Sequence, residues 1–194
     1  MLSCGLTMQI DQRYVEGAAY HEAAHAVIAA VQGMILRPQG VRIDPVGAGL
    51  TIYRHKKPDG SHDLGADPER ERTIISTAAG TFAHQKFYLD EAHTHFPAFG
   101  SHDDLDQILA LLKEMYSDRR QQDEAQERLM KESERLVTLH WKPIELVATR
   151  LWAKPWSRQG ALQWSPEKFE KVMEGADIAS VLAPMGINIV VQVP

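Results

Sequence analysis

The chain has 194 residues, 44% of them hydrophobic, which is a typical length for one domain burying about 70% of its unfolded surface. A net charge of −5 gives no electrostatic case for nucleic-acid binding, and the single cysteine, Cys4, excludes a disulfide within the chain. The N-terminus lacks a secretory signal pattern, and no apolar run is long enough to cross a bilayer, so we expect a soluble, cytoplasmic protein.

The first predicted element is a helix over residues 13–31, which contains the sequence His-Glu-Ala-Ala-His. On a helix, residues four apart lie one above the other, so His21 and His25 present two imidazoles on one face. Two such nitrogens can bind a metal ion, and Zn²⁺ is the ion that we expect. Glu22 lies beside this face, where it can accept a proton from a water at the metal, as a general base does.

The composition of this helix favours a metal site over a chance match to the motif. From Ala18 to Val31, every residue other than Tyr20 and the motif residues His21, Glu22 and His25 is Ala, Val or Ile, so we expect a buried central helix that ends before Gly33. Histidines in a buried helix need partners, because unpaired buried polar groups are costly.

A small β element is expected next. Residues 41–44 alternate apolar and polar, residues 45–49 have turn chemistry, and residues 50–55 are rich in β-branched and aromatic side chains. These two segments predict a hairpin or a loosely connected strand pair.

The rest of the chain is expected to be helical. Helices are predicted over residues 67–87, 101–115, 121–142 with a break or kink at Pro143, 144–152, and 165–175, followed by a terminal strand over 187–193. The charged residues of 121–142 are expected to form a solvated face. We therefore predict a mainly α fold with a small β element, one domain over 1–194, with a core of about 12–175 and a tail of 176–194.

Four segments together resemble the peptidase domain of FtsH-type membrane AAA metalloproteases. They are Tyr20-His-Glu-Ala-Ala-His-Ala26, the strand segment Val41 to Leu50, Ala78-Ala-Gly-Thr-Phe-Ala83, and Gly100-Ser-His-Asp-Asp-Leu-Asp-Gln107. The likeness follows the chain in order over roughly residues 12–173. It implies a helical, zincin-like domain with a short strand pair near the active-site cleft, zinc-dependent endoproteolysis, and Asp104 as third metal ligand.

The sequence also departs from that family. The AAA ATPase module and the transmembrane anchors are absent from this sequence, and it has no phosphate-binding GxxxxGK[ST] motif, so we expect activity that does not depend on ATP. Ala24 replaces the Gly of the motif, Asp103 replaces the Asn before the third ligand, and His84 replaces a Glu. The family's hexamers depend partly on the ATPase ring, which leaves open a homo-oligomer or a separate partner protein here.

The third ligand has three candidates in adjacent positions. The register of the family segment, with Leu105 and Ile108 fixing the inward face, favours Asp104. His102 is the alternative, because it would complete a three-histidine site. Asp103 points about 100° away from Asp104 on a helix, so it is expected to be a cap or a hydrogen-bond acceptor beside the site.

The leading hypothesis is a zinc-dependent endopeptidase that hydrolyses flexible or unfolded polypeptides. Substrate would extend along a strand edge, with Leu50, Thr51, Ile52 and Tyr53 as candidates, although plain packing explains these residues equally well. The alternatives are a zinc-binding regulatory module that does not cleave, or works only with a partner, and a zinc ion that only holds the fold together. The remaining histidines are expected in loops or on the surface: His55, His62, His93, His95 and His140.

Overall fold

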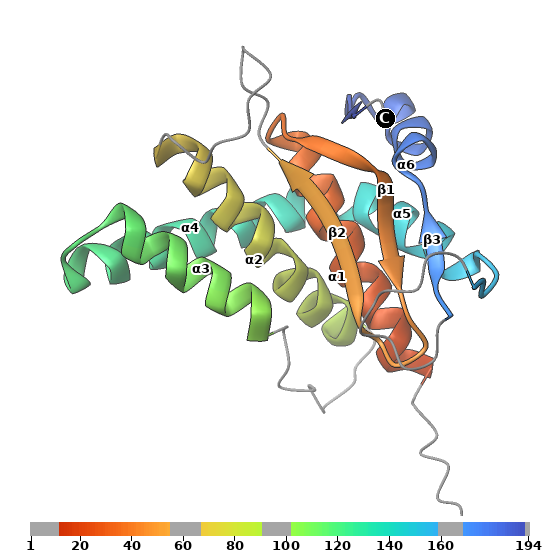
Figure 1. Cartoon of the computed structure of the whole chain (residues 1–194), viewed down its shortest axis with the longest axis horizontal. Coiled ribbons are helices and arrows are strands. Elements are labelled where there is room, and N and C mark those ends of the chain that lie inside the picture. The colour runs from red at the N-terminus through yellow and green to blue at the C-terminus, as the bar shows by residue number, and fades with distance from the viewer. Residues whose placement is uncertain (1–11, 55–66, 91–101, 159–168, 193–194) are drawn as a thin grey trace, which may run out of the picture.

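The computed structural model describes residues 12–54, 67–90, 102–158 and 169–192. It confirms a mainly helical fold with a small sheet (Figure 1). The elements are α1 (Gln12–Val31), β1 (Ile35–Ile43), β2 (Gly49–Arg54), α2 (Asp67–Asp90), α3 (His102–Met115), α4 (Arg119–Leu139), α5 (Trp141–Ala153), β3 (Lys171–Met173), α6 (Gly175–Leu182), the short 3-10 helix η1 (Ala183–Met185) and β4 (Val190–Val191).

Helix α1 is the central element. All its residues from Gly17 to Ala30 are buried, and it packs against α2, α5 and the β1–β2 pair (Figure 1). Its many alanines allow this close packing on several sides, because a methyl group is small enough for neighbouring backbones to approach the helix. The helix ends at Val31, and Gly33 follows with a φ of 75°, as predicted for a glycine after a helix C-terminus.

The sheet places β2 beside the motif helix. Strand β1 pairs antiparallel with β2 on one side, and on the other it pairs antiparallel with β3 and parallel with β4. Directly opposite residues of paired strands share a face. Gly49, Thr51 and Tyr53 lie opposite Ile43, Val41 and Leu36, whose side chains are buried. These three β2 residues therefore face the helices, and Leu50 and Ile52 face the other way.

Strand β1 is longer than predicted. It begins at Ile35 rather than Val41 and includes Pro38 and Gly40. Gly40 has a φ of 61° and lies against the backbone of Met173 and Glu174, at an irregularity in the pairing with β2. Only glycine fits both that conformation and that close approach.

The second half of the chain requires three corrections. The helix predicted over 165–175 is wrong where it can be checked, since 171–173 form strand β3; residues 165–168 lie outside the described ranges. The break expected at Pro143 falls at His140, so that Pro143 occupies the first turn of α5, where a missing N–H costs little. The core continues past residue 175, because Ile178 and Leu182 of α6 are fully buried.

The predicted terminal strand is shorter than expected. Of the described residues 187–192, Val190 and Val191 alone form strand β4, and they pair with Ile35 and Leu36 of β1; residue 193 lies outside the described ranges. Strand β1, which also pairs with β2, therefore supplies the edge that β4 needs. No helix in the described ranges is long and apolar enough to span a membrane.

Candidate metal centre

The two motif histidines face each other on α1. Their four-residue spacing places His21 Nε2 2.9 Å from His25 Nε2. Both residues are nearly inaccessible to solvent, with exposed fractions of 9% and 5%, and Glu22 between them is 6% exposed. Ligand atoms from these three residues lie within 4.8 Å of one another, which makes them the potential metal-binding cluster of the described residues.

Asp104 approaches the same point from the first turn of α3. Its Oδ2 lies 3.0 Å from His21 Nε2 and 3.4 Å from His25 Nε2. The neighbouring Asp103 is exposed, so these two aspartates diverge as their positions on a helix require. The side chain of His102 lies outside the described part of the structure, as do His55, His62, His93 and His95.

The three donor atoms have the spacing of a metal site. In a tetrahedral zinc site with bonds of 2.0–2.1 Å, two ligand atoms lie about 3.3 Å apart. The three separations observed here are 2.9, 3.0 and 3.4 Å. Two imidazole nitrogens and one carboxylate oxygen also match the ligand set of catalytic zinc sites, which leave a fourth position open.

Gly80 of α2 lies directly against these two nitrogens. A Cβ added to Gly80 would lie 2.6 Å from both His21 Nε2 and His25 Nε2. A side chain at this position would therefore crowd the two nitrogens. The absence of a side chain at residue 80 fits a group bound between the histidines.

A backbone carbonyl orients His25. Its Nδ1 donates a hydrogen bond of 2.8 Å to the carbonyl oxygen of Ser76 on α2. Because a carbonyl only accepts, Nδ1 must carry a proton, and Nε2 is the nitrogen that turns toward His21 and Asp104. Metal-binding histidines commonly have such a partner on the opposite nitrogen.

The imidazole of His25 and the carboxylate of Asp104 stabilise each other's charged forms. Burial opposes protonation of His25, but the Asp104 carboxylate outweighs it and raises the pKa of His25 to about 9. Burial also disfavours the charged form of Asp104, yet hydrogen bonds with His21 and His25 hold the pKa of Asp104 well below its usual range. A metal ion that binds His25 Nε2 would have to displace the proton of the charged imidazole.

Glu22 is held by strand β2. The hydroxyl of Thr51 lies 2.7 Å from Glu22 Oε2 and 3.0 Å from the Glu22 carbonyl oxygen. Gly49 lies against the Glu22 side chain so closely that an added Cβ would clash with Cγ and Oε1. Strand β2 thus holds Glu22, the candidate base, on the side that faces away from α1.

The four β2 residues predicted as a substrate edge divide into two pairs. Thr51 contacts Glu22, and the hydroxyl of Tyr53 lies 2.8 Å from Thr77 Oγ1 of α2. Burial raises the pKa of Tyr53, so this phenol is neutral. Leu50 and Ile52 are half-buried on the opposite face of the strand. The side chains of Thr51 and Tyr53 thus have hydrogen-bond partners inside the protein, and the substrate-edge role stays a prediction.

His84, which replaces a Glu of the family that the sequence resembles, lies in a second group of ring side chains. Its ring centroid is 6.2 Å from that of His21 and 5.0 Å from that of Tyr88, and its Nε2 is buried without a hydrogen-bond partner in the described residues. Burial, assisted by His21, lowers the pKa of His84 to about 4. Gly17 of α1 leaves room for this ring.

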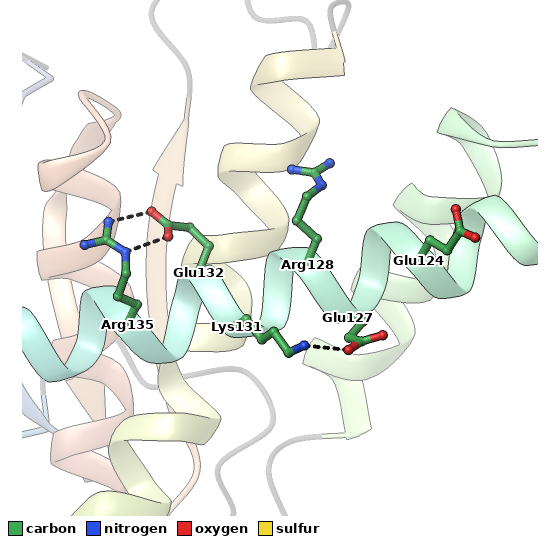
Figure 2. Close-up of a pocket in the computed structure, with 6 residues that line it drawn as sticks. All are labelled: Glu124, Glu127, Arg128, Lys131, Glu132 and Arg135. Carbon is green, nitrogen blue, oxygen red and sulfur yellow. Dashed lines mark hydrogen bonds and ion pairs between the residues drawn. The ribbon is translucent and has the colours of Figure 1, made fainter.

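A hollow along α4 has different chemistry (Figure 2). Glu127 pairs with Lys131 and Glu132 with Arg135, while Glu124 and Arg128 pair with residues outside the hollow. The two pairs within the hollow are exposed and lie along one helix, so the hollow is a solvated charged face, as predicted.

No family model matches the chain, and no curated protein matches its sequence.

Proposed function

We propose that the protein is a zinc-dependent endopeptidase that hydrolyses flexible or unfolded polypeptides. The observation that carries this proposal is the convergence of His21 Nε2, His25 Nε2 and Asp104 Oδ2 beside the carboxylate of Glu22. Three protein ligands with an adjacent carboxylate characterise catalytic zinc sites, whereas structural sites usually have four protein ligands. The resemblance to FtsH-type peptidase domains supports the same chemistry.

His21, His25 and Asp104 would hold the zinc ion, which supplies Lewis acidity to a water molecule and to the scissile carbonyl. Glu22 accepts a proton from the attacking water and delivers it to the departing amine. The carbonyl of Ser76 keeps the Nε2 of His25 directed at the site. Each of these residues belongs to a helix packed in the core, which limits reorganisation during the reaction.

The substrate is expected to bind as an added strand. Strand β2 pairs only with β1 among the described strands, so its other edge can offer backbone groups to an extended peptide. That binding mode requires a flexible segment, and we propose that ATP is not needed. A cytoplasmic location belongs to the same proposal, and a partner that delivers substrate is compatible with it.

The test combines metal analysis with cleavage of an unfolded substrate. Purified protein should contain one zinc per chain and cleave reduced casein, chelator should abolish cleavage, and ATP should leave the rate unchanged. His21→Ala should lose zinc. Glu22→Gln should keep zinc and lose about two to four orders of magnitude in rate, because an amide cannot accept the proton. Glu127→Gln, on the exposed face of α4, serves as the matched control and should retain full activity.

The outcomes separate the hypotheses. Zinc without cleavage in the wild-type protein would support the regulatory module, and wild-type cleavage by Glu22→Gln would exclude the proposed base. Full zinc occupancy in His21→Ala would exclude the site itself.

A further inference from the structure

The hydroxyl of Thr51 contacts the carboxylate of Glu22, the proposed general base. Thr51 Oγ1 lies 2.7 Å from Glu22 Oε2, a typical distance for a hydroxyl donating to a carboxylate. Thr51 lies on β2, 29 residues from Glu22 in the sequence, so this contact depends on the docking of the strand on α1.

A threonine has one hydroxyl proton and two acceptors within reach. The Glu22 carbonyl oxygen is 3.0 Å from Thr51 Oγ1, farther than Oε2, and it is neutral. Hydrogen bonds to ionised groups are shorter and stronger than those between neutral groups. The proton of Thr51 is therefore directed to the carboxylate whenever Glu22 is ionised.

This hydrogen bond makes the two oxygens of Glu22 unequal. Oε2 accepts from Thr51, while Oε1 has no hydrogen-bond partner in the described part of the chain. Oε1 lies against Gly49, the residue of β2 that precedes Thr51 on the same face, and the missing Cβ of Gly49 gives it room. One oxygen is thus held and the other is left open.

We propose that Thr51 is a positioning residue for Glu22: its hydroxyl holds Oε2 and leaves Oε1 to receive the proton from the attacking water. This inference rests on the proposed peptidase function. It gives Thr51 a role distinct from the substrate edge, because the side chain acts through Glu22 while the backbone of β2 remains available to a peptide. The strand then both fixes the base and offers the edge.

The kinetic test replaces the hydroxyl without changing the shape of the side chain. Thr51→Val should reduce kcat by about 10- to 100-fold, as loss of such supporting hydrogen bonds does, with KM and zinc stoichiometry unchanged. Thr51→Ser retains the donor and should restore most of kcat. Thr73→Val removes another buried hydroxyl of the protein, one bonded to the Glu69 carbonyl, and should keep wild-type kcat.

Three results would overturn the inference: an unchanged kcat in Thr51→Val, a loss of kcat in Thr51→Ser equal to that of the valine variant, or a higher KM as the main effect. The last of these would instead assign Thr51 to substrate binding.

A crystal structure of the metal-free protein provides a readout that does not depend on activity. In the wild-type and Thr51→Ser proteins the Glu22 carboxylate should occupy one position against β2, and in Thr51→Val it should lose that position. A carboxylate that stays in place in Thr51→Val would refute the positioning role. If the wild-type protein neither binds zinc nor cleaves casein, the peptidase proposal fails, and the comparison of crystal structures still decides whether Thr51 holds Glu22.

Discussion

Gly80 shows how much of a candidate metal site can depend on the absence of a side chain. The residue lies on α2, yet its Cα faces the two nitrogens that α1 presents. A helix interior ordinarily disfavours glycine by about 1 kcal/mol relative to alanine. Close approach to His21 and His25 is a physical reason for a glycine at this position.

Gly80→Ala should therefore abolish or strongly weaken zinc binding while leaving the protein folded. The added Cβ would lie 2.6 Å from both Nε2 atoms, so at least one imidazole must move away from the shared position. We expect a loss in zinc affinity of at least about 100-fold, measured by competition with a chelating dye, and unchanged far-ultraviolet circular dichroism. Thr81→Ala, one residue along the same helix, is the control and should bind zinc as wild type does. Equal affinities of Gly80→Ala and wild type would show that the metal does not lie between these nitrogens.

At the scale of elements, local patterns were more informative than long-range pairings. The helix that carries His21 and His25 could be predicted because its signal lies in consecutive residues. Strand β3 and the first half of β1 could not, since Pro38 and Gly40 interrupt the alternation and pairing across the sheet supplies the missing stabilisation.

The candidate site divides in the same way. The spacing of His21, Glu22 and His25 is visible in the sequence, and the position of Asp104 followed from the family resemblance. Leu105, which was expected to face inward, is instead 49% exposed. The contacts of Ser76, Gly80 and Thr51 depend on how α2 and β2 pack against α1, and no motif in the sequence marks them.

Helix α3 should respond to zinc more than α1 does. Its contact with the site is made by Asp104 in the first turn, while Ile108, Leu111 and Leu112 pack in the core. A zinc ion shared with α1 would stabilise that first turn, so hydrogen exchange of amides 106–110 should slow on zinc addition. At a free zinc concentration of about 100 times Kd, the linkage amounts to about 2.7 kcal/mol, or up to about 100-fold in exchange rate.

The control for this effect is Asp104→Asn, in which zinc should leave the exchange of α3 nearly unchanged. Residues 23–30 of α1 are protected by burial alone and should exchange slowly in all samples. Identical exchange of α3 with and without zinc in the wild-type protein would exclude Asp104 as a ligand.

The molecule as a whole combines a buried polar centre with a core that surrounds it on several sides. α1 is enclosed by α2, α5 and the β1–β2 pair (Figure 1). The buried ionisable groups in this core include His25 of α1 and His84 of α2. Their protonation states therefore affect the unfolding free energy of the entire chain. His84 is the clearest case, because its ring packs against the aromatic rings of Tyr14 and Tyr88 and its Nε2 has no hydrogen-bond partner in the described residues.

Acidification should lower the unfolding free energy, and part of this loss should depend on His84. Its pKa is lowered to about 4 in the folded protein, against about 6.5 when unfolded, so the unfolded state binds more protons between these values. This contribution to the unfolding free energy is fully present above pH 6.5 and is lost as the pH falls from 6.5 to 4. Between pH 7 and pH 5, wild type should lose about 2 kcal/mol more than His84→Gln, measured by urea unfolding with chelator present. Comparing the two proteins cancels the titration of His25 and Asp104, which both retain. Parallel pH profiles for the two proteins would show that His84 is not buried in its neutral form.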